Sequence, residues 1–146
     1  MTARRTVRYD ALIMRKFEQA LAWIVRIGLW LIPILPLYIS SSMLFPYITG
    51  KNFTFRIIVE IIFVAWVGLA ILKSEYRPRL TPLFKMITIF AAIVFLADLL
   101  SPNPYRAFFS NYERMEGFMM IGHLYLYFVM LVSVFRTRRD GLVFFH

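Results

Sequence analysis

Ionisable residues within apolar stretches of a sequence are costly unless they have partners, and four of those in this sequence are candidates for a functional role. They are Arg56, Glu60, Asp98 and His123. Arg56 and Glu60 are four residues apart, so they share one face of a helix and can pair there. Asp98 needs a cation, for which Arg106 or Arg56 is available. For His123 we expect a hydrogen bond to a neighbouring helix, since polar side chains commonly join helices in this way.

A second polar group lies between two apolar stretches, in the segment SPNPYRAFFSNYERME, residues 101–116. It contains Arg106, Tyr112, Glu113 and Arg114. A guanidinium group binds phosphate through two parallel hydrogen bonds, so arginines among aromatic residues suit a lipid-linked pyrophosphate. Pairing between Glu113 and Arg114 explains the same residues nearly as well. With no cysteine and two histidines, the sequence predicts neither a disulfide nor a metal site.

The apolar stretches that must position these groups cover about residues 20–39, 53–72, 83–100 and 117–135. Each approaches the length of a helix that crosses a hydrocarbon core of roughly 30 Å, and only helices satisfy their own backbone groups in lipid. The composition agrees, because 60% of the residues are hydrophobic and only 17% are charged. We therefore predict an all-α, polytopic membrane protein with four transmembrane helices across residues 20–136, preceded by a basic segment at residues 1–19.

The basic residues predict the orientation. Most of the 17 lysines and arginines lie before the first stretch, between the second and third, or after the fourth. Because cytoplasmic segments carry this excess, both termini are predicted to be cytoplasmic and residues 101–116 to form an outer loop. The same placement favours lipid headgroups over nucleic acid as the partner of the net charge of +9. A cleaved signal peptide within residues 1–42 is disfavoured by a long apolar run that contains Arg26 and two prolines.

Two segments resemble the N-terminal part of the bacterial O-antigen ligase family, which shares its core with O-antigen polymerases. One is N-P-Y-R-x-F-x-x-N-Y-E-R-M-E-G-F, residues 103–118, and the other is S-S-S-M-L-F-P-Y-I-T-G-K-x-F-x-F-R-x-x-V-E, residues 40–60. The resemblance extends over most of residues 36–140. Its most specific element is Y-E-R-x-x-G, formed by Tyr112, Glu113, Arg114 and Gly117.

The resemblance implies a glycosyltransferase of the bacterial inner membrane. Such an enzyme moves a glycan from undecaprenyl pyrophosphate to lipid A–core or a similar acceptor at the outer leaflet, without a cofactor or metal. Arg106 and Arg114 would bind the diphosphate or order the loop together with Tyr112, and Glu113 would orient Arg114.

The family's catalytic residues lie in a large periplasmic loop that nothing in this sequence matches, so no catalytic residue is assigned. Residues 137–146 look like the start of a further helix. We therefore expect an N-terminal fragment that is inactive alone and whose partner is the rest of a full-length protein. The alternatives are a small non-catalytic scaffold or subunit, and a small ion or proton transporter using Arg56, Glu60, Asp98 and His123.

Overall fold

The computed structural model of the protein describes residues 2–37, 49–110 and 116–135, and every element within these ranges is helical. The long helices are α1 (Thr2–Leu31), α2 (Thr49–Leu72), α3 (Pro82–Leu99) and α5 (Phe118–Val134). The shorter ones are the 3-10 helices η1 (Ile32–Leu37) and η2 (Ser74–Tyr76) and the α-helix α4 (Pro104–Phe109). The predicted all-α fold class is therefore confirmed for the described residues.

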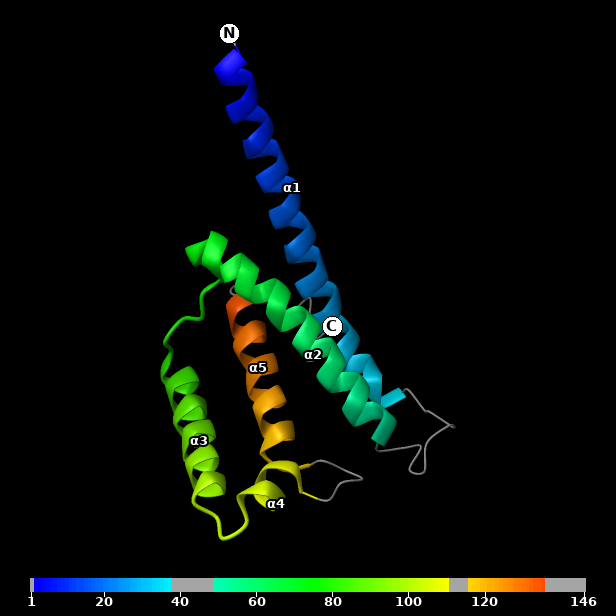
Figure 1. Ribbon diagram of the computed structural model, residues 1–146, viewed down its shortest axis with the longest axis vertical. Helices are drawn as coiled ribbons and strands as arrows, with labels where there is room; N and C mark the ends of the chain where they lie inside the picture. The colour runs from blue at the N-terminus through cyan, green and yellow to red at the C-terminus, as the bar shows by residue number, and fades with distance from the viewer. Residues whose placement is uncertain (1, 38–48, 111–115, 136–146) are drawn as a thin grey trace.

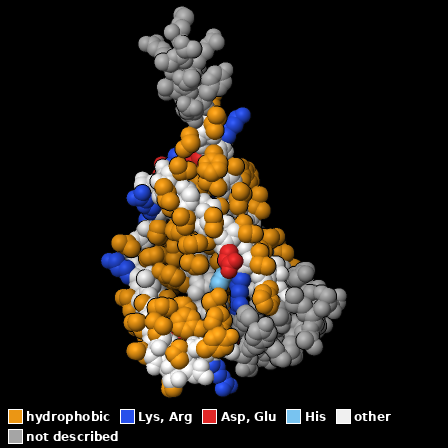
Figure 2. All heavy atoms as spheres, viewed as in Figure 1, with side chains coloured by type: hydrophobic (Ala, Val, Ile, Leu, Met, Phe, Trp, Pro, Cys, Tyr) orange, Lys and Arg blue, Asp and Glu red, His pale blue; other side chains and the backbone are white. Residues whose placement is uncertain are grey.

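Three segments in the described ranges are long and apolar enough to cross a membrane: Leu12–Leu37, Gly50–Leu72 and Pro82–Leu99. They correspond to the first three predicted crossings and indicate a membrane protein. Helix α5 is equally apolar but has 17 residues, one fewer than the shortest of these segments. The fourth crossing and the cytoplasmic location of both termini therefore stay predictions. Large hydrophobic side chains cover much of the visible surface, as expected for helices that face lipid (Figure 2).

The helices alternate in direction along the chain (Figure 1). As a result, η2 and the end of α5 lie towards one end of the molecule, and α4 lies at the other, next to the start of α5. Helix α1 packs along α2, and α5 lies between α2 and α3. Proline limits α1, because Pro33 has no backbone N–H to continue the α-helical pattern, and the chain goes on as η1.

The core is formed mainly where α1 crosses α2. Val25 and Leu29 of α1 are fully buried against α2, which contributes the buried Val59 and Ile62. Gly28, between the two α1 residues, lets the helices approach closely, since an added Cβ would overlap the Ile62 side chain. Such close approach at small residues is typical of helix packing in membranes, where dispersion contacts rather than hydrophobic burial hold helices together.

The segment predicted as an outer loop contains a short helix. The side-chain oxygen of Asn103 accepts a hydrogen bond from the Arg106 backbone N–H at 3.3 Å, and Pro104 occupies the first turn. An asparagine cap followed by proline is a standard helix start, because the proline N–H would have no partner there. Helix α4 therefore forms from residues that sequence analysis treated only as a connection.

Candidate functional site

A polar contact joins the buried His123 of α5 to Glu60 of α2, which is exposed at the surface of the bundle. His123 is 8% exposed, and its Nε2 lies 3.2 Å from Oε1 of Glu60. Its other ring nitrogen, Nδ1, lies 2.6 Å from the carbonyl oxygen of Met119, one turn earlier in α5. The prediction that His123 makes a hydrogen bond to a neighbouring helix is confirmed, and the partner is Glu60.

This geometry determines where the protons are. The Met119 carbonyl can only accept, so Nδ1 of His123 carries a hydrogen and donates it. Nε2 and the Glu60 carboxyl group form a hydrogen bond only when a second proton lies between them, because two acceptors would otherwise face each other. The pair is either an imidazolium with a carboxylate or a neutral imidazole with a protonated carboxyl group. Both forms are neutral overall, which lowers the cost of placing the pair among apolar helices.

Arg56 lies one turn before Glu60 on α2 and is 6% exposed. Its guanidinium carbon is 5.8 Å from the centre of the Phe53 ring, within the range of a cation–π contact. Arg56 is desolvated by burial and feels the favourable charge of Glu60, and the pairing predicted from the four-residue spacing stays a prediction. The Glu60 carboxyl group bonds to His123, however, which the spacing could not indicate. Acidic, basic and histidine side chains meet on a face that is otherwise mostly hydrophobic (Figure 2).

Asp98 and Arg106 do not join this cluster. Asp98 is half-buried near the end of α3, and Arg106 is exposed on α4. Within the described ranges, neither forms an ion pair, so the predicted Asp98–Arg106 and Asp98–Arg56 contacts are not seen. Tyr112, Glu113 and Arg114, the other candidates for diphosphate binding, lie outside the described residues.

Helix α4 is fixed to the bundle by aromatic rings. Phe108 of α4, Phe95 of α3 and Phe118 of α5 contact one another, with ring centres 5.1–5.7 Å apart. Gly117 packs so closely on the α4 carbonyl groups of Ala107 and Phe108 that a Cβ would overlap them. Helix α4 is therefore held against both neighbouring helices, with Arg106 left exposed to solvent or headgroups.

Comparisons with protein-family models, with curated protein sequences and with solved structures each gave no match. The resemblance to O-antigen ligases therefore stays a prediction. In the described part of the chain, no group of three metal-ligating side chains occurs.

An ion pair that was not predicted from the sequence lies at the opposite end of the bundle. Lys73, directly after α2, places its Nζ 2.5 Å from Oε1 of Glu18 on α1. The hydrogen bond to Glu18 raises the pKa of Lys73 above its usual value of 10.5. The two residues are far apart in sequence, so only the packing of α1 on α2 brings them together. The sequence did contain one indication that Glu18 pairs with a cation, since it is an acidic residue in a strongly basic stretch.

Proposed function

We propose that this chain forms the first membrane helices of an O-antigen ligase-like glycosyltransferase in the bacterial inner membrane. Its outer segment would bind the diphosphate of undecaprenyl-pyrophosphate-linked glycan during transfer to lipid A–core or a similar acceptor. The observation that carries the proposal is helix α4, which is packed against the end of the bundle and presents an exposed arginine there. The N-P-Y-R part of the family-like motif forms this helix, with Asn103 as its cap.

The chemistry follows from the charge of the leaving group. Pyrophosphate gains negative charge as the bond to the sugar breaks, so cations held in place beforehand stabilise the transition state. Arg106 is such a cation, and the motif adds Arg114, with Glu113 as its orienting partner. Placement on a short helix packed between α3 and α5 limits the motion of Arg106, which lowers the entropy lost on binding.

The proposal includes α5 as the fourth crossing and both termini in the cytoplasm. At 1.5 Å per residue, the 17 residues of α5 extend over about 26 Å, somewhat less than the roughly 30 Å hydrocarbon core. Packing against α2 and α3 supports this assignment, because a helix need not match the lipid thickness on the faces that protein covers. Reporter fusions test it: a reporter after Asn111 should be active outside, and one after Ser74 inside. The reverse pattern would contradict both the predicted orientation and the location of the proposed site at the outer leaflet.

Glycan transfer tests the binding role directly. In membranes that carry the full-length protein, Arg106→Lys and Arg114→Lys should each lower the transfer of labelled glycan to lipid A–core about ten-fold or more, since lysine lacks the two-pronged contact. Arg79→Lys is the matched control, because Arg79 is exposed at the opposite end of the bundle. Unchanged transfer in both variants, at protein levels equal to the parent, would contradict the proposal.

A further inference from the structure

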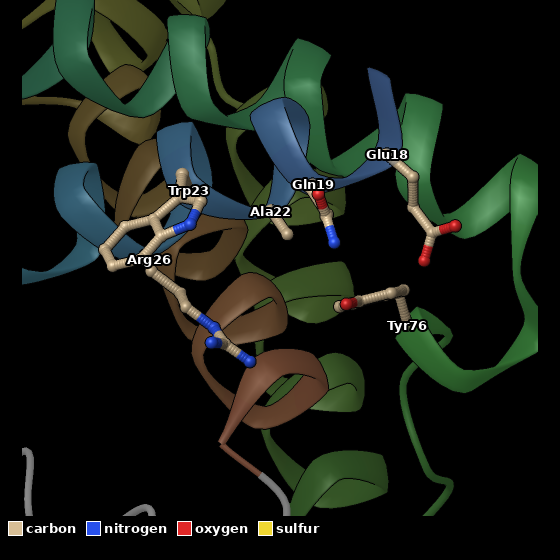
Figure 3. A pocket seen from close by; sticks show the side chains of 6 residues that line it. All are labelled: Glu18, Gln19, Ala22, Trp23, Arg26 and Tyr76. Carbon is tan, nitrogen blue, oxygen red and sulfur yellow. The ribbon is translucent and has the colours of Figure 1, made fainter. Parts of the chain in front are cut away.

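A second polar site lies between α1 and η2, at the end of the bundle opposite α4. A pocket of about 340 Å³ opens there between the two elements. It is lined by Glu18, Gln19, Ala22, Trp23, Arg26 and Tyr76. The polar ends of Gln19 and Tyr76 point into the space between Glu18 and Arg26 (Figure 3).

The charges around this pocket do not cancel. Glu18 is already neutralised by Lys73, whose Nζ lies 2.5 Å away. Arg26 is exposed and forms no ion pair with any residue that the structure describes. One positive charge therefore remains, beside side chains that can donate hydrogen bonds: the amide of Gln19, the hydroxyl of Tyr76 and the indole of Trp23.

The depth of Arg26 makes this charge costly without a ligand. Arg26 lies in the candidate membrane segment Leu12–Leu37. It follows Glu18 by eight residues, which on a helix is a displacement of about 12 Å from the level of the Glu18–Lys73 pair. An arginine at such a depth extends its guanidinium towards the nearest headgroups and draws polar groups inwards. The pocket beside it provides the space for such a group.

The wall that carries Tyr76 is firmly held. The indole N–H of Trp66 donates to the backbone carbonyl of Tyr76 at 3.0 Å, and Nε of Arg77 donates to the Ala70 carbonyl, also at 3.0 Å. Each bond joins a side chain to a backbone carbonyl, and together they hold η2 against α2. Neither bond uses the Tyr76 hydroxyl, which stays available to a ligand. The hydroxyl can therefore be removed without releasing η2.

We propose that this pocket binds a phosphate group, the phosphodiester of a phospholipid in the adjacent leaflet, between Arg26, Gln19 and Tyr76. A phosphodiester has one negative charge, which matches the charge left at Arg26. Its free oxygens accept hydrogen bonds, and the guanidinium fits two of them at once. Arg77 follows η2 directly and adds a positive charge at this end of the bundle, where it attracts anionic headgroups. The site is separate from the proposed glycan-transfer site and does not depend on that activity.

Native mass spectrometry of the detergent-solubilised full chain tests the proposal. The protein is titrated with dioleoyl phosphatidylglycerol and, in parallel, with dioleoylglycerol, which has the same chains but no phosphate. We expect the phospholipid to bind at least about ten-fold more tightly than dioleoylglycerol. Equal binding of the two lipids would overturn the proposal, because the acyl chains alone would then account for it.

Variants locate the bound phosphate. Arg26→Gln should weaken phospholipid binding about ten-fold or more, and Tyr76→Phe about two- to ten-fold, as expected for a charged and a neutral hydrogen bond. Arg79→Gln, which removes a nearby positive charge outside the pocket, should change binding by less than about two-fold. If Arg26→Gln fails to fold, Tyr76→Phe decides, since the ring and the backbone bond to Trp66 remain. Equal affinities for Arg79→Gln and the pocket variants would contradict the site.

A competition experiment distinguishes a phospholipid headgroup from free inorganic phosphate as the source of the bound phosphate. Inorganic phosphate at millimolar concentration should leave the lipid bound, because a free ion lacks the acyl chains that hold the headgroup at the membrane surface. Displacement of the lipid from the parent protein, but not from Arg26→Gln, would support the phosphate site and assign it to free phosphate instead.

Discussion

The close contact of α1 with α2 at Gly28 offers a sharp test of the helix packing. Gly28 of α1 is buried, and a Cβ added there would overlap Cγ2 of Ile62 on α2. Cγ2 is attached directly to the branched Cβ of Ile62, so it cannot swing aside as the end of a long side chain can. In Gly28→Ala, either the Ile62 rotamer or the separation of the two helices must therefore change.

The expected magnitude follows from two opposing effects. Overpacking a close contact costs about 1–3 kcal/mol. Replacing glycine by alanine within a helix returns up to about 1 kcal/mol, because the backbone loses less entropy on folding. We expect Gly28→Ala to destabilise the protein by about 1–2 kcal/mol. Ile62→Ala removes the overlapping atom, so the added methyl should cost nothing in that background, which gives a coupling energy of similar size.

Equilibrium unfolding in mixed micelles of a mild detergent and sodium dodecyl sulphate, followed by tryptophan fluorescence, measures these free energies. Two glycines in other helices serve as controls. A Cβ at Gly122 would lie 3.6 Å from the Phe118 ring, an ordinary contact, and one at Gly68 would lie 3.3 Å from the mobile end of Leu21. Both alanine variants should be neutral or slightly stabilising. If Gly28→Ala matches them, α1 and α2 do not pack as the structure has them.

Three further predictions use the same unfolding assay. Gly117→Ala should destabilise the protein by about 1–3 kcal/mol, because the added methyl group overlaps backbone carbonyl groups that cannot rotate away. A neutral effect would mean that α4 is not packed on α5. Glu60→Gln should lower the free energy of unfolding by less than about 1 kcal/mol, since the amide can donate to Nε2 of a neutral His123. His123→Leu removes this acceptor and should lower the free energy of unfolding by about 1–3 kcal/mol. Equal losses in the two variants would contradict the bridging proton. The raised pKa of Lys73 means that its ion pair stabilises the fold fully below about pH 10.5 and stops doing so as the pH rises through the higher folded value. The parent should therefore lose more stability than Glu18→Gln above pH 10.5, and parallel curves would exclude the pair.

Hydrophobic runs were sufficient to locate the apolar part of each long helix. The third predicted helix, residues 83–100, differs by one residue at each end from α3, because Thr81 caps the helix and Pro82 starts it. The first predicted helix, residues 20–39, differs more from α1, which begins at Thr2. Membrane hydropathy locates the part of a helix that lipid surrounds, but a helix can continue into water wherever no proline or capping residue stops it.

Contacts between helices were less accessible from the sequence. The four-residue spacing of Arg56 and Glu60 suggested a pair because neighbours on one helix can be counted along the chain. Which helix lies beside Glu60, and which face it presents, depends on packing, so His123 was recognised as a link between helices but not as the partner of Glu60. The pairing of Glu18 with Lys73 was missed for the same reason.

Packing also explains why α5 differs from the other long helices. It contacts each of α1, α2, α3 and α4. Two of its polar side chains bond to these neighbours, His123 to Glu60 and the Tyr125 hydroxyl to Thr88 at 3.0 Å. Rules of length and hydropathy describe a helix whose surroundings are lipid, as for α3, where Ile89, Phe90 and Ile93 are exposed. A helix that packs on four neighbours over part of its surface need not match the lipid thickness by itself, so the 17-residue length of α5 leaves the fourth crossing a prediction.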